Sequence, residues 1–357
     1  MKNSDVLLRH LRDGVTYYPL DSAEEWNALQ AEVISLRQSV LADITLRSES
    51  AIGGTAHEFS LETREFLAAD TETRRRLMAH PAMGIWLRQA ARTPGSELGQ
   101  PDSLRRLRDE FVAVRDRCLS GAADDCATVA GSIQVRRYDV DPLIAHIAPP
   151  TFDFSARQEK NGNGQRAAAS AAYPLDFFTQ VAAIAMERIA TTWPELHTMM
   201  PQFVHTLVHV PDGTFRSASA ARYNGVVFLA ADDDNLLAME ESLVHEFGHQ
   251  VLYWVMELDP LFSNEGDTDF ELPWSGAERD FYGFYHAFYI YILLAHYYRR
   301  VYETRPEHHG EAMSRYREIT TGLTAAIPRI RAAGDFTPRG QLFTDNICAA
   351  ARLAISD

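Results

Sequence analysis

The feature that most constrains this chain is a long apolar stretch, residues 236–258, with the pattern of a single buried helix. Apolar side chains recur along it at helical spacing, at Leu243, Phe247, Val251 and Val255. The stretch stops just before Pro260, a residue that cannot continue a helix. The sequence therefore predicts one long helix here, and any fold of the chain has to accommodate it.

The rest of the chain predicts more helices and a few short strands. Further helices are expected over residues 22–46, 71–92, 104–119, 174–193 and 281–298, with 71–92 divided into two pieces near Pro81. β-branched runs predict strands within residues 132–140, 202–210 and 224–230, with a Pro-Asp-Gly turn between the last two. We expect a mainly α fold with a small antiparallel β-sheet (α+β). A helical N-terminal region (1–130) would precede a metal-binding catalytic region (131–357). The two regions could also form one continuous domain.

Composition narrows the class of partner. The 357 residues carry a formal net charge of −15, which argues against nucleic acid and against anionic membranes as partners.

The three scattered cysteines form no disulfide framework, and no signal peptide is evident, so a cytoplasmic location is expected. The aromatic segment 281–298 lacks Asp, Glu, Lys and Arg, yet its tyrosines and histidines favour a buried helix over a membrane span. The oligomeric state is left open.

A His-Glu-x-x-His motif lies in the middle of the long helix, at His245, Glu246 and His249. Histidines four residues apart project from one side of a helix and can bind the same metal ion. The alternative is a pair of core histidines satisfied by hydrogen bonds. The helical context favours the metal site, and the ion could be zinc or iron.

A third protein ligand is required, because two histidines rarely hold a catalytic metal alone. Position 255 is Val255, so the extended zinc-peptidase spacing, with a histidine six residues after the motif, is excluded. The downstream candidates are Glu265, Asp267, Asp269, Glu271, Glu278, Asp280, His286 and His296. We favour His286, because a histidine inside an apolar aromatic helix needs a partner, but a carboxylate such as Glu278 stays open.

Residues 217–298 resemble the 2-oxoglutarate-dependent HExxH-type peptide β-hydroxylases that modify ribosomally made peptide natural products. The resemblance rests on Gly225 and Leu229 in a strand, on Glu241-Ser-Leu-Val-His245-Glu246-Phe-Gly-His249, and on Pro273-Trp274, Arg279 and Gly283-Phe-Tyr-His286. One departure is the segment after Trp274, which lacks an arginine and two prolines of the family pattern.

The resemblance implies an iron(II) enzyme that uses 2-oxoglutarate and O2 to hydroxylate an unactivated carbon, at Cβ of a peptide residue. Iron(II) would be held by His245, His249 and His286, as three facial ligands that leave open positions. The co-substrate 2-oxoglutarate would be bound by Trp274 and an arginine, with Arg279 as the first candidate and Arg222 and Arg216, just before the strand, as alternatives. A peptide or other amino-acid-derived substrate is expected.

Glu246 is the catalytic candidate, and its role separates two functions. In the oxygenase it would orient a ligand or water. In a zinc-dependent metallopeptidase, the alternative function, it would be the general base that activates water. A non-enzymatic helical binding protein is the third hypothesis.

Overall fold

The computed structural model describes residues 4–49, 54–98, 100–119, 126–138, 173–211, 216–231, 235–264, 266 and 270–356. The chain divides into two compact units. The first unit comprises Met1–Ala28, Ala127–Ser219 and Val226–Asp357, and the second comprises Leu29–Cys126 and Ala220–Gly225. The sequence boundary expected after residue 130 lies near this division, but the first 28 residues belong with the C-terminal part of the chain.

The second unit is helical throughout the residues described. Its helices are α2 (Ala23–Glu49, from Leu29 onward), α3 (Gly54–Leu67), α4 (Thr71–Ala79), α5 (Pro81–Arg92), α6 (Gly95–Leu98), α7 (Pro101–Leu119) and the short η2 (Ala221–Tyr223). They enclose a core that includes Phe59, Trp86 and Phe111. The break expected near Pro81 within residues 71–92 is confirmed, because His80 ends α4 and caps α5 ahead of Pro81.

The first unit contains a small sheet of five strands in the order β1-β2-β3-β5-β4. The strands are β1 (Thr128–Val129), β2 (Ile133–Arg137), β3 (Thr206–His209), β4 (Ser217–Ala218) and β5 (Val226–Leu229). All residues of β3 and β5 are buried, as expected for strands covered on both faces.

The expectation of an antiparallel sheet is wrong for its centre. β2 pairs with β3 and β3 with β5 in parallel, and only the edge strands β1 and β4 are antiparallel. The physical reason is the connections, because a parallel pair needs a long crossover. The chain passes from β2 to β3 through α9 (Leu175–Thr192) and α10 (Pro194–Phe203). Along the chain, β4 comes between β3 and β5, although in the sheet β5 is the neighbour of β3. The predicted Pro-Asp-Gly turn therefore does not join β3 and β5 as a hairpin.

The expected long helix is α11 (Leu236–Leu258), and its ends follow from local sequence. The Asn235 side chain accepts a hydrogen bond from the Ala238 amide (3.0 Å) at the start, and Asp259-Pro260 ends the helix. α11 contacts β4 and β5, and the Gln250 amide donates to the Val226 carbonyl at 3.2 Å. The sheet therefore supports the helix that carries the His-Glu-x-x-His motif.

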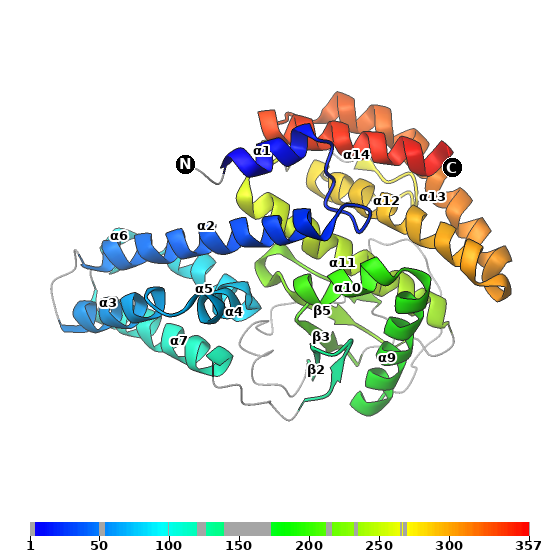
Figure 1. Ribbon diagram of the computed structural model, residues 1–357. Helices are drawn as coiled ribbons and strands as arrows, with labels where there is room; N and C mark the ends of the chain where they lie inside the picture. Colours follow the sequence, from blue (N-terminus) through cyan, green and yellow to red (C-terminus); the bar gives the residue numbers. More distant parts are fainter. Residues whose placement is uncertain are drawn as a thin grey trace. The chain divides into compact units, whose positions relative to one another are not determined.

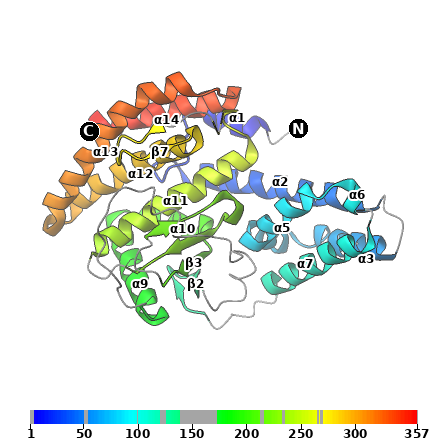
Figure 2. The same cartoon turned by 180° about the vertical axis from the view of Figure 1, so that it is seen from behind.

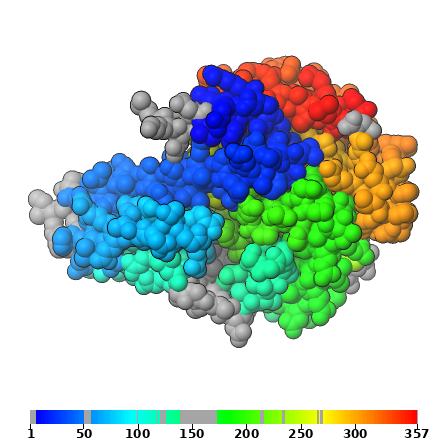
Figure 3. Space-filling view, in the orientation of Figure 1, coloured from blue at the N-terminus to red at the C-terminus, as the bar shows by residue number. Residues whose placement is uncertain are grey.

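Three C-terminal helices complete the first unit. These are α12 (Phe281–Thr304), α13 (His309–Ala333) and α14 (Pro338–Ser356), with the short η3 (Pro306–His308) between the first two. α12 contacts α11, α13 and α14, and therefore lies buried among helices (Figure 1). Figure 3 shows α13 and α14, in orange and red, packed side by side at the surface.

Two short strands and the N-terminal segment pack on this helical layer. β6 (Phe270–Glu271) and β7 (Glu278–Arg279) form an antiparallel pair next to α12, as Figure 2 shows for β7. α1 (Ser4–Arg12) contacts α14. The Tyr18 hydroxyl donates to the Tyr289 carbonyl at 2.7 Å, which ties the segment after α1 to α12.

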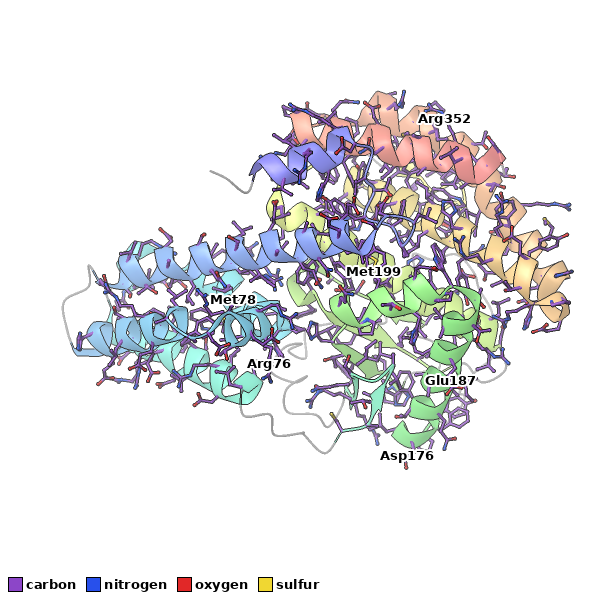
Figure 4. The ribbon with its side chains drawn as sticks, viewed as in Figure 1. Arg76, Met78, Asp176, Glu187, Met199 and Arg352 are labelled. Atoms are coloured by element: carbon purple, nitrogen blue, oxygen red, sulfur yellow. The ribbon has the colours of Figure 1, made fainter. Side chains whose placement is uncertain are left out.

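The interior and the surface follow the expected separation of side chains. Met199 of α10 is fully buried, whereas Asp176 and Glu187 of α9 and Arg352 of α14 are exposed (Figure 4). Among the described helices, none combines the length and the apolar character needed to cross a bilayer.

Gly340 in the first turn of α14 gives a test of this packing. A Cβ added there would lie 1.7 Å from the Leu261 carbonyl oxygen, whereas one added at the exposed Gly310 would meet nothing within 4 Å. Gly340→Ala should therefore destabilise the protein by about 1–3 kcal/mol or more. Gly310→Ala, the matched control, should be neutral or stabilising by up to about 1 kcal/mol. Thermal and urea unfolding of both variants measure the difference, and equal stabilities would contradict this packing.

Candidate metal centre

His245 and His249 lie on one stripe of α11, together with Ser242. Residues three, four and seven positions apart on a helix face the same direction. The rings of the two histidines have centroids 5.1 Å apart. Both residues are partly buried.

His286 of α12 joins this pair. Its ring is stacked on that of His249 with centroids 5.3 Å apart, and the two Nδ1 atoms share a hydrogen bond of 3.1 Å. Gly248 lets the helices approach, because a Cβ there would lie 3.1 Å from Ile290 Cγ1. The structure therefore brings all three histidines proposed as ligands to one place, where α11 and α12 meet.

Burial sets the protonation of these imidazoles. It lowers the pKa of His286 to about 3. Burial also lowers the pKa of His245, while the nearby Glu246 acts in the opposite direction. Both rings are therefore neutral at pH 7 and keep a lone pair for a metal or a hydrogen bond. His286 Nε2 is buried and has no hydrogen-bond partner among the described residues.

One distance among the histidines matches that of a metal site, but the side chains as they stand do not form a complete set of ligands. Two nitrogens bound to one ion at about 2.1 Å, with an angle of about 90–110°, are about 3.0–3.4 Å apart. The His249–His286 separation of 3.1 Å falls in this range. As the side chains stand, however, no group of three or more His, Cys, Asp or Glu residues in the described part of the chain could hold a metal ion.

Tyrosines enclose the ring of His286. The ring of Tyr282 lies 4.2 Å from it and that of Tyr253 lies 5.3 Å from it, as centroid distances. Tyr253 also stacks on His249 with centroids 5.8 Å apart. This aromatic packing restricts how far the two histidines can move.

Glu246 is held by a serine of the neighbouring sheet edge. Its buried carboxylate accepts a hydrogen bond from the Ser219 hydroxyl at 2.6 Å. Ser219 follows directly after β4. The contact fixes one carboxylate oxygen of Glu246 and leaves the other for a ligand or a water molecule.

Glu241, one turn before His245, forms a buried ion cluster. Its carboxylate accepts hydrogen bonds from Arg315 Nη2 (2.7 Å) and from the Tyr298 hydroxyl, and Arg216 Nη2 lies 3.4 Å away. Burial by itself would raise the pKa of Glu241, but the charges of Arg216 and Arg315 outweigh it and lower the pKa to about 2. Arg315 also lies 5.9 Å from the centre of the Tyr291 ring.

Tyr291 connects this cluster to the histidines. Its ring centroid is 6.4 Å from that of His245. On its other side it stacks against Trp274 with centroids 4.2 Å apart. The Trp274 indole N–H donates to the Ile319 carbonyl (3.0 Å), so this expected co-substrate residue uses its one donor to hold α13.

The structure gives contacts for both arginines expected to bind 2-oxoglutarate. Arg279 of β7 packs over Gly283 in the first turn of α12, and its Nη1 donates to the Glu278 carbonyl at 2.9 Å. Arg222 belongs to the second unit, where its guanidinium lies 4.7 Å from the ring centre of Tyr223.

Most of the other candidates for a third ligand have a described position. Glu271 and Glu278 are exposed, and Asp280 caps α12 by accepting from the Gly283 amide at 2.7 Å. His296 packs against Trp193, with ring centroids 6.4 Å apart. Glu265, Asp267 and Asp269 lie outside the described residues.

Sequence reasoning missed Ser219, Tyr291 and Arg315. Arg315 follows Glu241 by 74 residues, and no local pattern announces such a contact. Tyr291 was one tyrosine among many in an aromatic helix.

Comparison with known proteins adds no assignment: no family model matches the chain, and no curated protein is significantly similar to it. The resemblance of residues 217–298 to peptide β-hydroxylases therefore stays a prediction.

The ion cluster predicts how stability depends on pH. The pKa of Glu241 is about 2 in the folded chain, against 4.5 for a free glutamate. The unfolded chain thus binds more protons between these values, and the stability from Glu241, about 3 kcal/mol, is present above pH 4.5 and lost as the pH falls towards 2. Glu241→Gln should destabilise the protein strongly at neutral pH and less as the pH falls.

Urea unfolding at several pH values between 5.5 and 3.5 gives the measurement. Glu303→Gln is the control, because Glu303 is half exposed and forms a surface ion pair with Arg299 one turn away on α12. A difference between wild type and Glu241→Gln that stays constant over this pH range would contradict the assignment.

Proposed function

We propose that this chain is an iron(II)- and 2-oxoglutarate-dependent oxygenase that hydroxylates an unactivated carbon, at Cβ of a residue in a ribosomally made peptide. The observation that carries the proposal is the meeting of His245, His249 and His286 between α11 and α12. The Nδ1 atoms of His249 and His286 are 3.1 Å apart, a separation that fits two ligands of one ion and supports the proposal. The peptide substrate rests on the resemblance of residues 217–298 alone.

The donor set fits the proposed ion in its chemistry. Three neutral imidazoles suit a first-row divalent metal and, as facial ligands, leave three positions open. The rings would reach a common point by rotation about their side-chain bonds, since the histidine rings are already in contact. When bound, iron(II) would supply the oxidising chemistry, in which substrate, 2-oxoglutarate and O2 give hydroxylated substrate, succinate and CO2.

The protein's own side chains have defined tasks in this proposal. The tyrosines around His286 hold the third ligand in place and limit water near it. Ser219 orients Glu246, and Glu246 in turn can orient a ligand or water without giving up its charge. A carboxylate already bound by a buried hydroxyl supports this orienting role.

The zinc-dependent metallopeptidase is the competing function. It would use the same three histidines, with Glu246 as general base. The observation in its favour is that Glu246 is buried on α11 between the two histidines of the motif. The two functions differ in the metal bound and in what the loss of Glu246 does.

The ligand set can be tested by metal content. His245→Ala, His249→Ala and His286→Ala should each weaken iron(II) binding by more than about 100-fold, because the loss of a supporting contact outside the ligand shell already costs 10–100-fold. His296→Ala, on the same helix as His286, should keep the metal. Iron per chain is measured by mass spectrometry after anaerobic loading and desalting. Retention of full iron by any of the three variants would move the site elsewhere.

Glu246→Gln separates the oxygenase from the hydrolase. The substitution keeps the shape and removes the charge. In the oxygenase it should lower, but not abolish, the conversion of 2-oxoglutarate to succinate, measured with iron(II) and O2 without peptide. In a zinc peptidase, loss of a general base would lower cleavage of casein by about 10²–10⁴-fold. Zinc-dependent cleavage that ignores 2-oxoglutarate and vanishes in Glu246→Gln would refute the oxygenase.

A further inference from the structure

The junction between α9 and α10 carries two buried polar groups that have no hydrogen-bond partner. Thr192 is the last residue of α9, and Trp193 is the single residue between the two helices. The Thr192 hydroxyl and the Trp193 indole N–H are buried, and neither forms a hydrogen bond within the described part of the chain. A buried donor left in this way is costly. Two such donors, adjacent in the sequence, indicate an acceptor that the protein itself does not provide.

Thr192 differs in this respect from the other threonines of α9 and α10. Each of the others donates its hydroxyl to the carbonyl four residues earlier; these are Thr179 (2.8 Å), Thr191 (3.0 Å) and Thr198 (2.9 Å). Such a bond is the usual way in which a threonine inside a helix satisfies its hydroxyl. The Thr192 hydroxyl is not used in this way and is free to bind another group.

Arg300 of α12 covers the ring of Trp193. Its guanidinium carbon lies 4.2 Å from the ring centre, and its side chain is partly buried. Loss of hydration lowers the pKa of Arg300, although the charges of Glu195 and Glu303 act in the opposite direction. Among the described residues, none forms a hydrogen bond or an ion pair with this guanidinium. A guanidinium stacked on an aromatic ring keeps its N–H groups at its edge, where they can bind an anion.

The start of α10 adds backbone donors beside Trp193. The helix has ten residues and begins at Pro194, and its N-cap, Trp193, gives no side-chain hydrogen bond to the amides of the first turn. Pro194 and Glu195 are exposed, so this end of the helix faces solvent. Free amides and the helix dipole make such an end favourable for an anion. The unpartnered side chains of Thr192 and Trp193 occupy the same turn.

We propose that Arg300 and the junction of α9 and α10 form a binding site for a phosphate group. The phosphate lies between the guanidinium and the start of α10 and accepts hydrogen bonds from Thr192 and Trp193. A phosphate group suits donors from several directions, because it has three strong acceptor oxygens. The chain has a formal net charge of −15 and offers no general attraction to phosphate, so binding depends on these local donors. The site shares no residue with the histidine cluster and is independent of the proposed function.

Thermal unfolding with and without inorganic phosphate tests the site. Sodium chloride keeps the ionic strength constant, so that general screening does not contribute. Phosphate that binds the folded chain should raise the wild-type Tm as its concentration rises. Arg300→Gln removes the charge, and Thr192→Val keeps the shape but removes the hydroxyl. Each should weaken phosphate binding about 10- to 100-fold, as expected for a hydrogen bond to a charged group.

The controls separate loss of binding from loss of structure. Thr192→Val removes an unsatisfied buried hydroxyl, so without phosphate it should be at least as stable as wild type. Thr191→Val and Arg299→Gln alter the preceding residue in each case, at a helical hydroxyl and at a surface ion pair, and should keep the wild-type response. Arg300→Lys, which keeps the charge without the fork, replaces Arg300→Gln if that variant unfolds, and should give an intermediate response.

Methyl phosphate distinguishes the free ion from a phosphate group carried by a larger molecule. It should raise the Tm of wild type as inorganic phosphate does, because the proposed donors contact only the phosphate oxygens; a response to inorganic phosphate alone overturns the assignment to a carried phosphate group. Glu195→Gln removes an exposed negative charge from the first turn of α10 and should bind phosphate at least as tightly as wild type. A wild type whose Tm ignores phosphate, or variants Arg300→Gln and Thr192→Val that respond as wild type does, would overturn the site.

Discussion

Two consecutive buried carboxylates fix how α11 lies against α12. Glu240 and Glu241 accept hydrogen bonds from the consecutive tyrosines Tyr297 and Tyr298. Each also binds an arginine from beyond the aromatic part of α12, with Arg305 Nη1 2.5 Å from Glu240 and Arg315 Nη2 2.7 Å from Glu241. A buried carboxylate without such partners would be costly, so the two helices have one favourable register.

The site depends on this register. With Glu241 opposite Tyr298, His249 lies opposite His286, and Gly248 lets the helices come close enough for the rings to stack. A shift of one residue along α11 would turn its side chains by about 100° and separate the histidines. Buried ion pairs are weak evidence for stability, and their use here is to specify one arrangement of two otherwise apolar helices.

Much of the mainly helical fold could be predicted from local sequence, because caps, prolines and apolar periodicity are local signals. Asn235 and Pro260 mark the ends of α11, and Pro81 marks the break between α4 and α5. The direction of β3 relative to β5 could not be predicted, since it depends on the crossover between them and not on their own residues. Within the candidate site, the His-Glu-x-x-His spacing and the isolated His286 could be recognised from the sequence as candidate ligands. The contacts of Arg315 and Tyr291 were not, because they form only when distant helices pack.

The order in which the chain is synthesised gives these buried carboxylates a further consequence. The closest arginine partner of Glu240 lies 65 residues further along the chain, and that of Glu241 lies 74 residues further. Arg188 and Arg216, which lie 3.6 Å from Glu240 and 3.4 Å from Glu241, precede α11. During translation, α11 therefore leaves the ribosome with part of the neutralising charge already made and before its closest arginine and tyrosine partners exist. The helix can form at that time, but burying its two acids must wait until α12 is complete and α13 has begun. The histidine-bearing stripe of α11 is thus expected to reach its final packing late, as one of the last steps of folding the first unit.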